Sequence, residues 1–420
     1  MSLSERIDEI RAGFTRTFWV ANITELFERL SYYGVNAVLA IYLHESLGFT
    51  ETETGDVMGF FGGVVWFLPI LGGALADRFG FRRALAFAYL VLALGYFLLG
   101  SLSASWMMPL REAIPLPTMI ILILMIPALG PAIVKPCVVG TTARASTENV
   151  RSLGYSIYYT LVNIGGTAGP LVAYAIRTTI GIENVFRVCA ISVFLMFFAT
   201  VIFYKEPRQE GEAKVASVAQ TLKNLLTVLS NFKFMLFLLI FSGFWVVFWS
   251  EFIALPLYVR RFVDPNADVD LLLSVDPFIV IVFQILVSHW TRKISPFGAM
   301  TLGLLVSSLA WLILSVYSTI IGTIIALVVL AIGEMIQSPR YYEYVSRLAP
   351  SGQQGVYMGF AFLPIAIGFV IAGSVGGRLI EHFGSVGQPH VVWWVISGWG
   401  IVATGLMWVY NSIVVKRGNA

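Results

Sequence analysis

Long runs of apolar residues, separated by short polar segments, fill most of the chain. Twelve runs reach about 20 residues, the length that an α-helix needs to cross the hydrocarbon core of a bilayer. They lie at approximately 14–44, 55–77, 83–104, 116–141, 152–176, 185–204, 232–259, 270–290, 297–316, 319–347, 355–380 and 390–415. The pattern therefore predicts an all-α membrane protein with twelve transmembrane helices.

One long polar connection, residues 205–231, separates the sixth run from the seventh. The other connections between runs are much shorter. We therefore expect two six-helix halves, namely an N-terminal bundle at 1–204 and a C-terminal bundle at 232–420, joined by the linker at 205–231.

The basic residues are distributed unevenly between the two sides that this topology defines. Arg29 and Lys135 lie inside predicted helices, and only six arginines fall on one side of the membrane: Arg111, Arg177, Arg187, Arg260, Arg261 and Arg378. The rest of the 27 Lys and Arg residues fall on the side that carries both termini and the linker. Because basic residues accumulate in cytoplasmic loops, we expect both termini and the linker to be cytoplasmic, in a multi-pass protein of the cell membrane.

The composition supports a membrane protein and argues against several other classes. Hydrophobic residues make up 58% of the 420 residues and charged residues only 12%, against about 25% charged in soluble domains. Cys137 and Cys189 lie inside apolar runs and indicate no disulfide framework. The sequence contains no phosphate-binding loop, no metal-ligand spacing and no nucleophile triad, so we expect neither an enzyme nor a cofactor, and no nucleic-acid partner.

The first apolar run carries charged residues near its middle, Glu25, Glu28 and Arg29. Each ionised side chain there costs about 2.5–3.5 kcal/mol on insertion scales. One helical face contains Asn22, Glu25, Arg29, Tyr32, Tyr33 and Asn36. We expect this face to line a polar cavity inside the bundle. The alternative, a buried Glu25–Arg29 pair that only fixes packing, leaves Glu28 unexplained.

The stretch Gly73–Arg83 resembles the G-x-x-x-D-R-x-G-x-R-R loop between the second and third helices of the major facilitator superfamily. The resemblance implies that superfamily's fold, with a binding site between the two halves near the bilayer midplane. Asp77 and Arg78 are expected to act as a gate at the cytoplasmic mouth. A generic cluster of cytoplasmic positive charge is the alternative.

Further motifs resemble those of the proton-dependent oligopeptide transporters. Residues 25–34 are similar to the family's E-x-x-E-R-F-x-Y-Y-G signature, with Leu30 in the phenylalanine position. Residues 130–136 resemble the family segment that carries a lysine, here Lys135. Residues 155–165 resemble the segment that carries an asparagine, here Asn163. Residues 333–339 supply the Gly-Glu and Ser-Pro pairs of the tenth helix.

The resemblance implies a role for each matching residue. Arg29 and Lys135 would bind the C-terminal carboxylate of a peptide, and Asn163 and Glu334 its amino terminus. Glu25 and Glu28, with Arg29, would couple transport to proton movement. The other residues expected at the substrate are Tyr32, Tyr33, Trp66, Tyr158, Asp276 and Ser338.

The charges alone support the same view. Arg29 and Lys135 are the only basic residues deep in the predicted bilayer, and they face a surplus of acids: Glu25, Glu28, Glu251, Asp276 and Glu334. A dry cavity with more acids than bases should keep at least one carboxyl group protonated. A substrate carboxylate that competes for the two cations would then change which acids need a proton.

Several positions depart from the family pattern. Asp276 stands where the resemblance suggests an asparagine, and it either attracts a cationic group or merely stabilises a helix N-terminus. Trp66 replaces a cavity tyrosine and serves either as an aromatic wall or as packing. Glu251 is offset from the family's acid, and we expect an extracellular gate or a plain helix-end ion pair, with Arg260 or Arg261 as its partner. Arg340 and Glu343 are expected to form a cytoplasmic gate.

These observations favour a monomeric, proton-coupled symporter that imports di- or tripeptides by alternating access. A proton-coupled carrier of another small zwitterionic or cationic solute, working as symporter or exporter, is the alternative on the same fold. A third hypothesis is a membrane sensor or assembly factor that binds peptide without moving it. The expected partners are a small solute, the coupling proton and the lipid bilayer.

Overall fold

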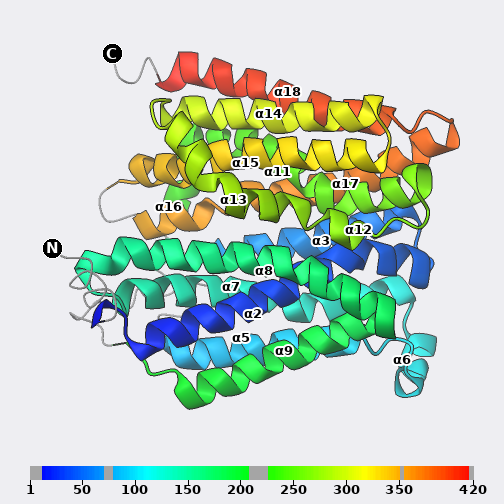
Figure 1. Ribbon diagram of the computed structural model, residues 1–420, viewed down its shortest axis with the longest axis horizontal. Coiled ribbons are helices and arrows are strands. Elements are labelled where there is room, and N and C mark those ends of the chain that lie inside the picture. The colour runs from blue at the N-terminus through cyan, green and yellow to red at the C-terminus, as the bar shows by residue number, and fades with distance from the viewer. Residues whose placement is uncertain (1–11, 71–78, 208–225, 351–353, 416–420) are drawn as a thin grey trace. The chain divides into compact units, whose positions relative to one another are not determined.

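The computed structural model describes residues 12–70, 79–207, 226–350 and 354–415 (Figure 1). Helices make up nearly all of this part of the chain, and no strand occurs in it. Its one extended contact is an isolated bridge between Phe14 and Ser146. The predicted all-α class is therefore confirmed.

The chain forms two compact units, which we describe separately. The first comprises residues 1–35 and 71–217, and the second comprises residues 36–70 and 218–420. The first unit contains most of α2 (Arg16–Ile41), with α5 (Phe81–Leu99), α6 (Met108–Ala113), α7 (Leu116–Arg144), α8 (Arg151–Ile180) and α9 (Ile182–Phe203). The second contains α3 (Glu51–Phe67), α11 (Phe232–Tyr258), α12 (Val269–Leu272), α13 (Val275–Thr291), α14 (Pro296–Val316), α15 (Ile320–Leu348), α16 (Gln354–Phe360), α17 (Leu363–Ser385) and α18 (Val391–Tyr410).

Every predicted span corresponds to a helix, but not every helix is apolar enough to identify a span on its own. Nine helices in the described ranges are long and apolar enough to cross a membrane. The other three predicted spans correspond to α2, α3 and α8. Charged residues interrupt α2, α3 has 17 residues before the undescribed segment at 71–78, and α8 is rich in polar residues. That α2, α3 and α8 also cross the membrane, which would give twelve crossings, thus stays a prediction.

Two predicted spans are each divided into two helices. The run 270–290 contains α12 and α13, which are separated at Leu273 and Ser274. The run 355–380 contains α16 and α17, and α16 ends at Phe360. Pro277 and Pro364 lie four residues beyond Leu273 and Phe360. A proline provides no N–H for the carbonyl four residues earlier and its ring clashes with that carbonyl, which favours an interruption there. The same cost is tolerated in α7, α8, α11 and α15, which continue through internal prolines.

A capping box explains why α3 begins four residues before the predicted apolar run. The Thr50 hydroxyl accepts from the Glu53 backbone N–H at 3.1 Å, and the Glu53 carboxylate accepts from the Thr50 N–H at 2.9 Å. Two otherwise unpaired backbone donors are satisfied in this way. Polar residues can therefore extend the helix beyond its apolar part.

In the first unit, α8 approaches α2 at two glycines. A Cβ atom on Gly165 would lie 2.8 Å from Cβ of Arg29, and one on Gly169 would lie 2.5 Å from the Leu30 carbonyl oxygen. Only glycine leaves room for backbones this close. Gly165 therefore permits close packing of α8 beside the charged part of α2.

In the second unit, α3 and α17 pack backbone against backbone. A Cβ atom on Gly373 would overlap the carbonyl oxygen of Gly55 and would lie 2.7 Å from the Gly59 nitrogen. The second unit thus joins a helix from the first half of the sequence to one near its end.

We predict that Gly373→Ala destabilises the second unit by about 1–3 kcal/mol, because an added methyl group in a close-packed contact forces the backbones apart. Thermal loss of helical circular dichroism in detergent measures the effect. Gly405→Ala is the matched control, since its new Cβ meets no atom within 4 Å and both changes raise helix propensity equally. Equal unfolding temperatures for the two variants would contradict the prediction.

Candidate functional site

The charged residues of α2 form a buried ion pair in the first unit. Glu25 and Glu28 are completely buried, and Arg29 is 1% exposed. Arg29 donates through Nε to Oε2 of Glu28 at 2.5 Å and through Nη2 to Oε1 at 2.7 Å, whereas its Nε lies 3.5 Å from Oε1 of Glu25. A two-pronged guanidinium–carboxylate contact is among the strongest polar interactions in proteins.

Helical spacing accounts for only part of this pairing. Residues four apart normally face each other, and adjacent residues do not, which is why the alternative interpretation paired Glu25 with Arg29. That ion pair is present at 3.5 Å, and the adjacent Glu28 adds the shorter, two-pronged contact. Both carboxylate oxygens of Glu25 are buried without a hydrogen bond.

Lys135 of α7 belongs to the same cluster. It lies within electrostatic range of Glu25, Glu28 and Arg29, and its residue is partly exposed. The Tyr32 ring lies under the Arg29 guanidinium, 4.8 Å from its centroid, and Tyr33 contacts that ring edge-on. Two bases and two carboxyl groups therefore balance one another in this cluster, the α2–α7 cluster.

The α8 residues expected at the site belong to the same unit. Tyr158 and Asn163 are both partly exposed, and the Asn163 amide donates to the Tyr159 carbonyl oxygen at 2.9 Å. α8 packs against Arg29 at Gly165, two residues beyond Asn163. Their part in substrate binding stays a prediction.

A second group of buried charges lies in the second unit and consists only of acids. Glu251 of α11 and Asp276 of α13 are 0% and 3% exposed, and Glu334 of α15 is partly exposed. Asp276 and Glu334 lie within hydrogen-bonding range of each other, and Glu251 is within electrostatic range of both. None of the three has an ion pair within the described ranges. We call them the acid cluster.

Carboxyl groups held close together away from water repel one another when ionised, so such a group favours a proton or a cation among them. The acid cluster is an arrangement of this kind. Asp276 also lies in the first turn of α13, where an acid is favourable for the helix dipole. Both interpretations of Asp276 thus apply to one buried side chain.

The other predicted residues of the second unit have local partners. Trp66 is 6% exposed, and its ring lies 6.0 Å from those of Trp249 and Phe362. Ser338 accepts a hydrogen bond from the Gln337 amide at 2.7 Å. Arg340 pairs with Glu343 at 2.9 Å, and Glu343 also pairs with Arg347. The gate residues Asp77 and Arg78 lie outside the described residues.

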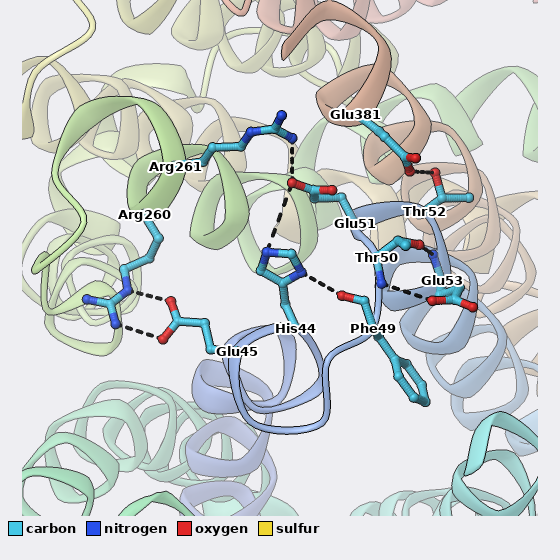
Figure 2. A network of polar contacts seen from close by, with 10 residues as sticks. All are labelled: His44, Glu45, Phe49, Thr50, Glu51, Thr52, Glu53, Arg260, Arg261 and Glu381. Atoms are coloured by element: carbon cyan, nitrogen blue, oxygen red, sulfur yellow. Dashed lines mark hydrogen bonds and ion pairs between the residues drawn. The ribbon is translucent and has the colours of Figure 1, made fainter. Parts of the chain in front are cut away.

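Figure 2 shows a network of ion pairs around the segment that joins α2 to α3. Arg260 forms a two-pronged contact with Glu45, with both distances 2.8 Å, and Arg261 contacts Glu51 at 2.5 Å. His44 lies 4.0 Å from Glu51. The suggested pairing of Glu251 with Arg260 or Arg261 is therefore wrong, because both arginines extend to acids outside α11 and Glu251 is buried.

The same network continues along α3 and α17. Arg378 forms a two-pronged contact with Asp56 at 2.6 and 2.9 Å, and the Thr52 hydroxyl donates to Glu381 at 2.5 Å. Sequence reasoning missed Glu45, Glu51 and Asp56 as partners. The sequence does place these acids on the same predicted side of the membrane as Arg260, Arg261 and Arg378. It does not indicate which acid pairs with which arginine, because that depends on how the helices pack.

The sequence model of the Major Facilitator Superfamily matches residues 22–363. The chain belongs to this superfamily. Membership confirms the predicted superfamily fold and a multi-pass membrane transporter, and it agrees with the prediction that the protein is not an enzyme.

Curated relatives of the chain fall into two groups. Multidrug resistance protein MdtH of Yersinia enterocolitica is 21% identical over 392 residues, which cover 91% of this chain and 92% of that protein. Dipeptide and tripeptide permease B of Aliivibrio fischeri is 29% identical over 178 residues, 42% of this chain and 34% of that one.

Solved structures share the fold. A POT family transporter crystallised with a thioalcohol-conjugated peptide has a TM-score of 0.78 at 18% identity, and covers 94% of this chain and 96% of its own. A peptide transporter POT crystallised with sulfate has a TM-score of 0.76 at 18% identity, covering 94% and 95%.

We predict that Glu45→Arg and Arg260→Glu each lower the stability of the second unit, and that the double variant Glu45→Arg/Arg260→Glu recovers it. Since both side chains are partly exposed, the coupling energy should be about 0.2–1 kcal/mol. A double-mutant cycle on thermal unfolding in detergent measures it. Additive effects of the two changes would show that the pair makes no net contribution.

Proposed function

We propose that the protein is a proton-coupled symporter of the proton-dependent oligopeptide transporter family, importing di- or tripeptides by alternating access. The observation that supports this most is the buried two-pronged contact between Glu28 and Arg29, with Lys135 in electrostatic range. A transporter needs a site that binds its substrate and releases it again. A cation that already has an internal carboxylate partner can exchange that partner for the carboxylate of a peptide.

The charge balance of the α2–α7 cluster suggests how protons would be coupled. Two bases and two acids are balanced when all are ionised, so one additional carboxylate creates a surplus negative charge away from water. Such a charge is costly, and it is removed if Glu25 or Glu28 takes up a proton. Glu28 would take up the proton if the peptide carboxylate replaces it at Arg29. Glu25 is the other group that could take up the proton, because its carboxylate oxygens have no hydrogen bond that protonation would break. One peptide would then carry one proton.

The acid cluster, which includes Glu334, carries the negative charge that the amino terminus of a peptide requires. Asn163, Tyr158 and the Tyr32–Tyr33 pair would contribute neutral contacts. In this proposal the halves divide at the 205–231 linker, both termini are cytoplasmic, and a monomer suffices. The peptide-binding structures with the same fold and the partial match to a peptide permease support the proposal.

A carrier of a cationic solute is the second candidate. Glu251, Asp276 and Glu334 form a buried group of acids with no base paired to them among the described residues. The MdtH relatives match nearly the whole chain. A cation with apolar surface, of the kind that multidrug carriers handle, would suit these acids without needing Arg29 or Lys135.

We predict that proteoliposomes with an inward proton gradient accumulate labelled dialanine, and that an uncoupler abolishes accumulation. Arg29→Lys keeps the charge but loses the two-pronged geometry, so uptake should fall about tenfold or more, equivalent to losing a charged hydrogen bond of about 1.5–3 kcal/mol. Lys135→Ala should lower it similarly. Lys293→Ala, which removes an exposed base between α13 and α14, is the control and should transport normally.

Three results would contradict the peptide symporter. Accumulation that persists with the uncoupler would show that transport is not coupled to protons. Equal uptake in Lys135→Ala and Lys293→Ala would show that Lys135 does not bind the peptide carboxylate. Saturable binding of dialanine without accumulation would instead favour the sensor hypothesis.

The second candidate makes a different prediction for Asp276→Asn. If the acid cluster binds a cationic solute, proton-driven transport of ethidium should occur and should be lost in this variant, while Lys135→Ala leaves it unchanged. The change from carboxyl to amide conserves the shape of the side chain and leaves it able to donate to a neighbouring carboxylate; thermal unfolding in detergent checks that the variant folds. Absence of ethidium transport in the unmodified protein would count against this candidate.

A further inference from the structure

A short helix lies between two candidate membrane spans of the first unit. α6 (Met108–Ala113) and the 3₁₀ turn before it (Ser105–Met107) belong to the connection between α5 and α7. Both of these longer helices are apolar enough to cross a membrane. Figure 1 shows α6 beyond the ends of the long helices. A segment in this position begins and ends at a membrane surface.

The segment exposes a stripe of apolar side chains, which we call the α6 stripe. Its positions follow the spacing i, i+3, i+4 and i+7, which places them on one face of a helix. The stripe consists of Trp106, Pro109, Leu110 and Ala113, all of them exposed. Ser105 and Glu112 are exposed as well, but they lie seven residues apart on a different face. Separate apolar and polar faces are typical of a helix that lies in the plane of a membrane surface.

The third face of the segment is attached to the rest of the first unit. Met107 is 2% exposed, and the Arg111 guanidinium donates to the Leu102 carbonyl oxygen at 3.3 Å. Just before the segment, the Ser103 hydroxyl donates to the Glu183 carboxylate at 2.6 Å, in the first turn of α9. These contacts fix which face of the segment points away from the protein, and that face includes the α6 stripe.

The α6 stripe continues an exposed apolar row on α5. The Trp106 ring stacks on that of Phe97 in the last turn of α5, with centroids 6.1 Å apart and an interplanar angle of 12°. Phe97 is the last member of a row spaced three or four residues apart along the helix, namely Phe87, Leu90, Leu94 and Phe97, each between 44% and 52% exposed. On a candidate span of a multi-pass membrane protein, such a row contacts acyl chains. Trp106 therefore lies where that surface reaches the membrane boundary.

We propose that α6 and the turn before it anchor this end of the first unit in the bilayer interface, with the α6 stripe inserted among the lipids and Glu112 in water. The amphipathic Trp106 ring suits the boundary between acyl chains and head groups. Arg111 is the one base of the segment and already donates to a carbonyl oxygen, so insertion should not depend on the charge of the head groups. The anchor is separate from both charge clusters and does not depend on the transported solute.

Fluorescence quenching in proteoliposomes of the full-length protein tests the proposal. Leu110→Cys labelled with bimane should lose most of its fluorescence in brominated phosphatidylcholine and should resist quenching by iodide in the water, because an inserted side chain lies about 5–10 Å into the boundary of head groups and chains. Glu112→Cys is the matched control, since it is exposed on the same helix and should show the opposite pattern. Cys137 and Cys189 are buried, so the unmodified protein gives the background labelling.

Further measurements separate the bilayer from other occupants of the α6 stripe. Ala113→Cys should repeat the pattern of Leu110→Cys, and brominated phosphatidylglycerol should quench both labels as strongly as brominated phosphatidylcholine. Equal quenching by iodide at 110 and 112, with no effect of brominated lipid at either, would overturn the proposal, because the segment would then lie in water. Protection of residue 110 from both quenchers that grows with the ratio of protein to lipid would also overturn it, since a second copy would then cover the stripe. All three labelled positions are exposed, so no label displaces a buried side chain.

Discussion

The ion pair between Glu28 and Arg29 is the interaction on which the organisation of the first unit depends. A guanidinium at 1% exposure within an apolar helix is tolerable only with a partner of opposite charge at hydrogen-bonding distance. The requirement extends to the neighbours: α7 contributes Lys135, the Tyr32 ring lies against the guanidinium, and α8 approaches at Gly165. Helices that must cross an apolar medium are thus arranged around one polar cluster.

The two units handle buried charge in opposite ways. In the first, bases and acids are equal in number, and the closest contact is strong and geometrically specific. In the second, three carboxyl groups lie together without a base paired to them in the described part of the chain, and two of them are in hydrogen-bonding range. A balanced cluster responds to an added anion, and an acid cluster responds to a cation or a proton.

Close contact between helix backbones at glycines is the second constraint on the structure. Where α3 meets α17, glycines at 55 and 373 bring the backbones into contact, and Asp56 of α3 pairs with Arg378 of α17. Glu45, just before α3, pairs with Arg260. Residues 36–70 therefore cluster with the second unit, although they lie far before the 205–231 linker in the sequence.

The sequence alone was enough to predict the helical class, the approximate positions of the helices and the identity of the buried charges, because apolar length and the cost of an ion in lipid are local properties. It did not predict the interruptions before Pro277 and Pro364, since the apolar runs continue through them. The partners of these charges follow from tertiary packing. Arg29 adds a two-pronged contact with Glu28 to its ion pair with Glu25. Arg260 and Arg261 bind Glu45 and Glu51 rather than Glu251, and Asp276 joins two acids from other helices. Pairing depends on which helices pack together and on how long side chains bend, and neither is encoded in the spacing of residues along one helix.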